Sequence, residues 1–147
     1  MQDPISTSPE VTGPAYYRDE ASGVECREIS RHMGAQLGQA FQYVWRGWSS
    51  QKHQGAIDLE KALFWVRDWI ANPSIGQEAK DSVWDAFQRM ASKDGSLVFR
   101  RLAVLQNLYT ADTAVDVGTT SVIGFSVALI ERRIRELRES SELPLAR

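Results

Sequence analysis

Apolar residues recur along most of this chain at the spacing of an α-helix. The clearest run covers residues 56–71, where five apolar side chains fall at i, i+3, i+4, i+7 and i+11. They are Leu59, Ala62, Leu63, Val66 and Ile70. Few segments alternate apolar and polar residues with period two, so no β-sheet is predicted. The pattern predicts six helices, over residues 24–33, 35–46, 56–71, 75–92, 97–110 and 121–139.

The fold class that follows is all-α, a compact bundle of about six helices. Helices 35–46 and 56–71 are joined by a short polar loop at 48–55, so we expect them to form a central antiparallel hairpin. Gly47 is expected to cap the end of the first of these two helices. The other predicted helices also have apolar faces that we expect in the core. These residues are Cys26, Ile29, Met33, Leu37, Ala40, Phe41, Val44, Ala79, Val83, Ala86, Phe87, Met90, Val98, Leu102, Leu105 and Leu108.

The last predicted helix begins with an unusually broad set of apolar residues. They are Val122, Ile123, Phe125, Val127, Leu129 and Ile130. One interpretation is that part of this surface contacts a second copy of the chain, which would make the protein a homo-oligomer. The other is that this helix is simply buried at the centre of the bundle.

The chain length of 147 residues indicates one domain. Residues 1–15 contain Pro4, Pro9 and Pro14 and are expected to form a flexible arm. Residues 16–147 are then the single helical domain, with the motifs discussed below confined to 16–72 and an unassigned helical part over 73–147.

Composition excludes several classes of function. The net charge of −2 argues against a general nucleic-acid or membrane-coating role, which normally requires a basic excess. The single cysteine, Cys26, cannot form an intramolecular disulfide. No apolar run is long enough to span a membrane, and residues 1–14 lack the features of a signal peptide. We therefore expect a cytoplasmic protein. There is no P-loop, no G-x-G-x-x-G motif and no usual zinc site.

Candidate chemistry is concentrated on the predicted hairpin. In its second helix Asp58, Lys61, Trp65 and Trp69 fall at i, i+3, i+7 and i+11, beside the apolar face. A nucleotide site uses these groups: the cation meets phosphate, the aromatic ring stacks on a base, and the acid holds Mg²⁺ or a sugar hydroxyl. The alternative is an exposed Asp58–Lys61 pair of little energetic value, with both tryptophans covering the edge of the core.

The first helix of the hairpin carries a matching set, with Gln39, Tyr43 and Arg46 at i, i+4 and i+7. The guanidinium of Arg46 is well shaped for a phosphate, although a cation in the last turn also suits the helix dipole. Lys52 and His53 in the loop would add donors, or would simply be solvated. An antiparallel hairpin brings all of these groups close to Lys61.

A further group of polar residues lies on the first predicted helix. Glu25, Glu28 and His32 fall at i, i+3 and i+7. Two carboxylates on one side of a helix can bind a divalent cation. The alternative is a solvated acidic face.

Several short segments between residues 16 and 70 occur in a characteristic order. They are GVEC at 23–26, LGQAFQYVWR at 37–46, KHQG at 52–55 and DLEKA at 58–62, preceded by Tyr17 and followed by Trp65. Together they resemble a small bacteriophage domain that is often described as a nucleotide kinase of T7-like phages. Tyr16, Gln39, Gln42 and Glu28 stand where that family has His, Asn, Lys and Asp. The loss of a histidine and a lysine affects phosphoryl transfer more than nucleotide binding.

The resemblance implies a phage-encoded protein of deoxynucleotide metabolism, acting in the infected host cell as a nucleoside monophosphate kinase without a P-loop. Arg46, Lys52, His53 and Lys61 would then be the catalytic residues. Nucleotide binding would involve Tyr17, Tyr43, Arg46, Lys61 and Trp65. Glu25 and Asp58 would hold Mg²⁺. Two alternatives remain: a non-catalytic nucleotide-binding sponge that counters a host defence signal, and a protein-interaction module that uses the aromatic residues.

Overall fold

Helices account for almost all of the chain that can be described. The computed structural model describes residues 17–19, 22–50, 52–74, 77–93, 99–113 and 118–142. The helices are α2 (Cys26–Ser30), α3 (Ala35–Gly47), α4 (Lys52–Ala71), α5 (Asp81–Lys93), α6 (Phe99–Thr113) and α7 (Gly118–Glu142). An isolated bridge between Arg18 and Glu25 is the only β-type pairing within these ranges. The predicted all-α bundle of six helices is confirmed, whereas the predicted arm at 1–15 lies outside the described residues.

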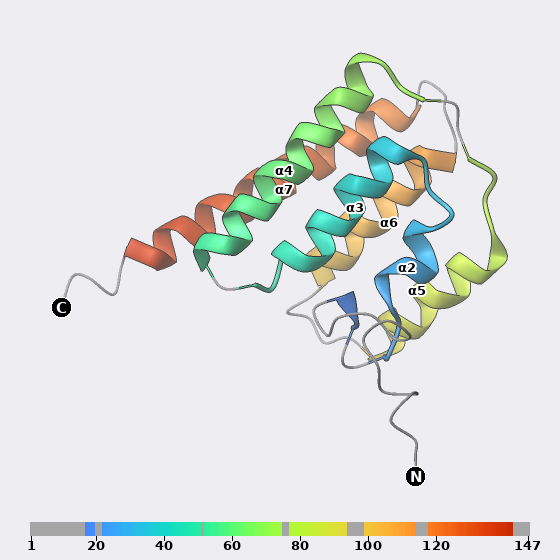
Figure 1. Ribbon diagram of the computed structural model, residues 1–147, viewed down its shortest axis with the longest axis horizontal. Helices are drawn as coiled ribbons and strands as arrows, with labels where there is room; N and C mark the ends of the chain where they lie inside the picture. The colour runs from blue at the N-terminus through green and yellow to red at the C-terminus, as the bar shows by residue number, and fades with distance from the viewer. Residues whose placement is uncertain are drawn as a thin grey trace, which may run out of the picture.

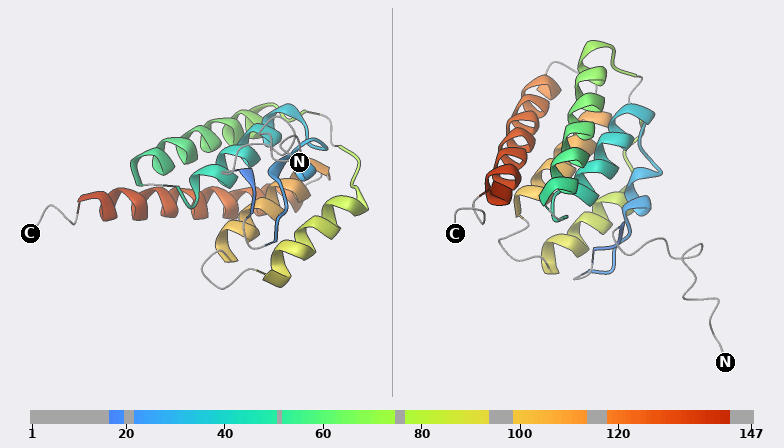
Figure 2. Two further views of the ribbon diagram at one scale, coloured as in Figure 1. Left: turned by 60° about the horizontal axis from the view of Figure 1, so that its bottom comes forward. Right: turned by 60° about the vertical axis from the view of Figure 1, so that its left-hand side comes forward.

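The α3–α4 hairpin is at the centre of the arrangement (Figure 1). Its two helices make the most extensive contact in the bundle, and α6 packs against α3. The last helix, α7, packs against both α4 and α6 and runs beside α4 in both views of Figure 2. The short α2 contacts α3 and α5, and α5 also contacts α6. The predicted central hairpin is therefore confirmed.

The core is built from the apolar faces that the sequence predicts. Aromatic rings from three helices meet inside it: Phe41 lies 6.3 Å from Phe87, which lies 5.9 Å from Tyr109, measured between ring centroids. Among the predicted core residues Met33 is only half-buried, Ala79 and Ile70 are exposed, and Val98 lies outside the described residues. All the other predicted core residues of the first five predicted helices are buried.

The second helix of the hairpin differs from the prediction in two ways. It begins at Lys52 rather than at residue 56, so the KHQG segment is helical and the loop is shorter. Near its other end Ile70 is 48% exposed, whereas Trp69 is 5% exposed and takes the inward position. Because α4 packs against both α3 and α7, its buried surface is a wide band. Trp69 lies three residues after Val66 and continues that band.

Two other predicted boundaries are also wrong. The first predicted helix, 24–33, is reduced to the five residues of α2. Helix α5 begins at Asp81 rather than at residue 75, because backbone groups before it are bound by α6. The Gln77 amide donates to the Asp112 carbonyl at 2.8 Å, and the Lys80 amide donates to the Tyr109 hydroxyl at 2.7 Å. Amides used in this way hold residues 77–80 in a non-helical path.

The predicted cap at Gly47 is replaced by a different role. The residue that follows, Trp48, has an ordinary right-handed backbone, with φ −58°, so no left-handed cap forms. A Cβ on Gly47 would lie 2.7 Å from the Asp58 Cβ. A Cβ on Gly55 would lie 2.7 Å from the Gly47 carbonyl oxygen. These two glycines let α3 and α4 approach closely at the loop end of the hairpin.

The broad apolar start of the last helix divides between the core and the surface. Ile123 and Ile130 are buried, together with Ile134 and Leu137 further along α7. Phe125, by contrast, is 58% exposed. Association with a second copy through this side of α7 stays a prediction. No helix in the described ranges is both long enough and apolar enough to cross a membrane.

The glycine contact predicts a specific loss of stability. Gly47→Ala places a methyl group against the backbone and side chain of α4, and we expect unfolding to become easier by about 1–3 kcal/mol because the helices must separate. Gly124→Ala is the control, since nothing lies within 4 Å of a Cβ there and the position is helical. That change is expected to stabilise by about 0.5–1 kcal/mol. Urea denaturation measures both, and equal effects would contradict the close approach.

Candidate functional site

A fully buried carboxylate lies where α3 and α4 approach most closely. The Asp58 side chain is 0% exposed. Its Oδ2 accepts a hydrogen bond from Arg46 Nε at 3.0 Å, and its Oδ1 accepts one from Arg46 Nη2 at 2.8 Å. Gln54, one turn earlier on α4, donates to Oδ1 at 3.2 Å. The pair is therefore bidentate, and it fixes the plane of the guanidinium.

Two cations lie close to the ring of Tyr43. The Cζ atom of Arg46 and the Nζ atom of Lys61 are each 5.6 Å from the centroid of its ring. Arg46 also lies over the ring of Tyr17, at 6.0 Å. Both distances are within the range of favourable cation–π contact. Four residues that the sequence singles out for nucleotide binding are thus brought together.

The contacts between α3 and α4 follow one antiparallel register. Arg46 pairs with Asp58, Tyr43 lies against Lys61, and Gln36 Nε2 donates to Asp68 Oδ2 at 2.8 Å. This register places Trp65 level with position 39, one turn beyond Lys61. Trp65 is half-buried against the core, and its ring makes an edge contact with Phe64 at 5.2 Å. We call Tyr43, Arg46, Asp58, Lys61 and Trp65 the hairpin seam.

Two of the other candidate residues, Trp69 and Glu25, have different surroundings. His53 is exposed in the first turn of α4, and Lys52 begins that helix. Trp69 is buried, as the alternative interpretation expected. The Glu25 carboxylate pairs with Arg27 Nε at 3.3 Å. Within the described ranges, no group of three or more His, Cys, Asp or Glu side chains is arranged to hold a metal ion.

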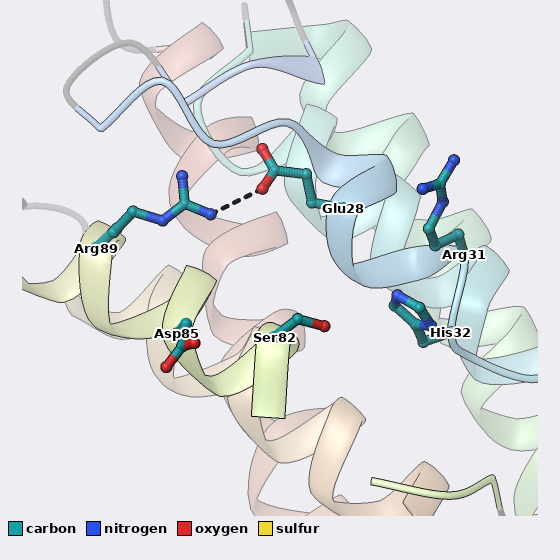
Figure 3. A pocket seen from close by; sticks show the side chains of 6 residues that line it. All are labelled: Glu28, Arg31, His32, Ser82, Asp85 and Arg89. Atoms are coloured by element: carbon teal, nitrogen blue, oxygen red, sulfur yellow. Dashed lines mark hydrogen bonds and ion pairs between the residues drawn. The ribbon is translucent and has the colours of Figure 1, made fainter. Parts of the chain in front are cut away.

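The predicted acidic face of the first helix becomes one wall of an open cleft (Figure 3). The cleft has a volume of about 440 Å³ and lies between α2 and α5. Six side chains line it, all of them polar or charged: Glu28, Arg31, His32, Ser82, Asp85 and Arg89. Glu28 accepts a hydrogen bond from Arg89 Nη2 at 2.8 Å across the opening. The cleft has charges of both signs but no Phe, Tyr or Trp among these six residues, whereas the seam combines cations with such rings.

Sequence reasoning identified some members of these sites and missed others. Glu28 and His32 are found through their helical spacing, but their partners Ser82, Asp85 and Arg89 come from a helix more than 40 positions away. Gln54 was missed because residues 52–55 read as a loop. Had that segment been taken as helical, the i, i+4 spacing of Gln54 and Asp58 would have predicted the contact.

Titratable groups outside the seam have shifted pKa values for identifiable reasons. Burial raises the pKa of the Cys26 thiol to about 12, so this side chain remains protonated and is a poor nucleophile. Burial also tends to raise the pKa of Glu28, but hydrogen bonds from the Glu25 amide and from Arg89 outweigh it. The net result is a lowered pKa for Glu28.

The seam predicts an unequal response to the loss of two arginines. Arg46→Ala leaves the buried Asp58 carboxylate without its bidentate partner, and we expect a loss of about 3–5 kcal/mol in the free energy of unfolding. Arg138→Ala removes an ion pair with Glu60 in which both side chains are about half exposed. That loss is expected to be about 0–1 kcal/mol. Chemical denaturation compares them, and an equally mild Arg46→Ala would refute the structural role of the pair.

The Glu28–Arg89 contact predicts a pH effect. A carboxyl with a lowered folded pKa stabilises the fold above its unfolded pKa, and this contribution is lost as the pH falls through the folded pKa. In Arg89→Gln the pKa of Glu28 is expected to rise, so the loss begins at higher pH. A ¹³C NMR titration of the Glu28 carboxyl measures the shift. Arg67→Gln, which removes the exposed pair with Glu131, is the control and is expected to leave the pKa of Glu28 unchanged.

Comparison with known proteins gives no relative for this chain. No family model, no curated protein and no solved structure matches it.

Proposed function

We propose that the chain binds a phosphorylated nucleotide at the hairpin seam. The observation that carries the proposal is that two cations, Arg46 and Lys61, both lie 5.6 Å from the centroid of the Tyr43 ring, with Arg46 held in place by the buried Asp58. The proposal agrees with the resemblance of residues 16–70 to the phage nucleotide kinase family.

The cations of the seam suit a phosphate group. Asp58 accepts hydrogen bonds from Nε and Nη2 of Arg46, and this bidentate contact fixes the orientation of the guanidinium. Lys61 is exposed, and no carboxylate in the described ranges forms an ion pair with it. Its ammonium lies 5.6 Å from the centroid of the Tyr43 ring. A phosphate that bridges Lys61 and Arg46 would gain charge-assisted hydrogen bonds, which are roughly twice as strong as neutral ones.

The aromatic residues supply the other half of a nucleotide site. Tyr43 and Tyr17 lie beside Arg46, and Trp65 lies one turn from Lys61. Stacking of a base on an aromatic ring contributes about 1–3 kcal/mol. Phosphate at the two cations and a base on Trp65 would place the ligand along the exposed edge of the hairpin.

The geometry favours binding over phosphoryl transfer. All three donors around Asp58 point at its carboxylate, and the side chain is fully buried. A magnesium ion at Asp58 would have to displace Arg46, so these residues do not fit the Mg²⁺ site that the resemblance implies. A nucleotide sponge and a kinase differ in whether the ligand is returned unchanged.

A protein-binding role is the second candidate, supported by one observation. Phe64 is 60% exposed and contacts Trp65 on the same helix. Together they give α4 an exposed aromatic surface next to the seam. Such a surface is typical of a protein contact when no small ligand covers it.

The proposal predicts stabilisation by nucleotides. Purified protein is mixed with deoxynucleoside mono- and triphosphates and with cyclic dinucleotides, each with and without Mg²⁺, and its melting temperature is measured. A ligand present at 100 times its dissociation constant is expected to add about 2.7 kcal/mol to stability. Chromatography of the mixtures then shows whether the nucleotide is turned over. A panel without any shift would contradict nucleotide binding and favour the protein-binding surface.

Lys61 is the variant that locates the binding site. Lys61→Ala removes a cation without leaving a buried charge unpaired, so the fold is expected to persist. Affinity for the nucleotide is expected to fall at least about tenfold, because a hydrogen bond to a charged group contributes about 1.5–3 kcal/mol. Lys80→Ala is the matched control, since Lys80 is exposed and pairs with Glu78 on the surface. Isothermal titration compares the two, and equal affinities would exclude the seam.

A further inference from the structure

A buried ion pair joins the N-terminal turn to the centre of the bundle. Asp19 Oδ1 accepts a hydrogen bond from Arg101 Nη2 on α6 at 2.8 Å. The two side chains are only 8% and 7% exposed. A buried pair of this kind rarely adds much net stability, because both charges lose their hydration. Its presence therefore points to a role in specifying an arrangement.

Asp19 also organises the turn that contains it. Its Oδ2 accepts hydrogen bonds from the Ser22 amide at 3.2 Å and the Ser22 hydroxyl at 2.5 Å. Its backbone amide donates to the Val24 carbonyl, and its carbonyl accepts from the Gly23 amide, both at 2.7 Å. Gly23 adopts φ +76°, which a glycine reaches without strain. One carboxylate thus connects a tightly bonded turn to a helix 82 positions away.

The other side of Arg101 faces the hairpin. Its Cζ atom lies 5.2 Å from the ring centroid of Trp45 on α3. Its buried Nε has no hydrogen-bond partner in the part of the chain that the structure describes. An unsatisfied buried donor is costly. The position of Arg101 thus favours its contacts with Trp45 and Asp19 over a hydrogen bond from Nε.

These contacts place Tyr17 beside the seam. Tyr17 precedes Asp19 by two residues, and Trp45 directly precedes Arg46. The ring of Tyr17 is 6.0 Å from the Arg46 guanidinium. We propose that Asp19 and Arg101 are positioning residues for the hairpin seam: by fixing the N-terminal turn against Trp45 they hold Tyr17 over Arg46. This role in ligand affinity rests on the proposed function, whereas the positioning itself does not.

The positioning is tested first without any ligand. In the wild-type chain, NMR is expected to show cross-relaxation between the Tyr17 ring protons and the Arg46 side chain. Asp19→Asn keeps the shape of the side chain and removes its charge, and these signals are expected to disappear. Arg100→Gln is the matched control, because Arg100 is the neighbour of Arg101 but pairs with Glu136 on the surface. Signals that persist in Asp19→Asn would overturn the proposal.

If Asp19→Asn does not fold, Ser22→Ala decides the question. This variant removes only the hydroxyl that bonds to Asp19 Oδ2, and the Tyr17–Arg46 signals are expected to weaken. Unchanged signals in a folded Ser22→Ala would overturn the proposal in the same way.

Affinity for deoxyadenosine monophosphate then separates positioning from general damage. Asp19→Asn and Tyr17→Ala are each expected to weaken binding about two- to fivefold, the value of one exposed cation–π contact. The double variant is expected to be no weaker than either, because Asp19 acts through Tyr17. Additive losses would overturn the role in affinity. If the wild-type chain binds no nucleotide, the proposed function fails, and the NMR comparison still decides the positioning.

Discussion

The bidentate contact between Arg46 and the fully buried Asp58 is the constraint on which this fold and its candidate site both depend. An ionised carboxylate cannot be buried unless its hydrogen-bonding capacity is met, because its desolvation costs several kcal/mol. Arg46 from α3 and Gln54 from α4 meet it together. They can do so only where Gly47 and Gly55 let the two backbones approach, and only if α4 has already begun by Gln54. Burial of Asp58 therefore requires three features together: the early start of α4, the close approach of α3 and α4, and the fixed orientation of the guanidinium.

Arg46 is a candidate ligand-binding residue and also the partner of a buried carboxylate, so replacing it with alanine does not separate these two roles. From the sequence alone, Arg46 is a surface cation in the last turn of a helix, and its removal would be expected to spare the fold. In the structure it neutralises a buried acid, so loss of binding after its removal could follow from loss of structure. Lys61 has no such partner among the described residues, although it faces the same Tyr43 ring. The exposed member of the seam is thus more informative about ligands than the central one.

Helical periodicity predicted the parts of this molecule that are governed by local spacing. The core faces of α3, α5 and α6 follow from it. The approach of Tyr43 and Arg46 to Asp58 and Lys61 follows as well, because an antiparallel hairpin with a short connection brings the end of one helix beside the start of the next. The sequence predicts a loop at residues 52–55 because these polar residues show no periodic pattern. Their helical state in the structure depends on the Gln54–Asp58 contact and on the packing of Gly55. The Asp19–Arg101 pair had no sequence signal, because 82 positions separate its members. The late start of α5 likewise depends on hydrogen bonds to α6.

The last turn of α3 connects these local and distant features. Trp45 supports Arg101, which holds the N-terminal turn, while Arg46, the next residue, binds Asp58 and lies beside two tyrosines. Consecutive side chains of a helix point in directions about 100° apart, so one turn can contact both Arg101 and the hairpin seam. Asp112 offers a contrast: it is buried without a cation, its only described hydrogen bond to the carboxylate comes from the Gly34 amide, and burial raises its pKa. The carboxylates near the seam are instead matched with arginines. A guanidinium stays charged across the physiological pH range, so Arg46 provides a constant positive charge beside Tyr43.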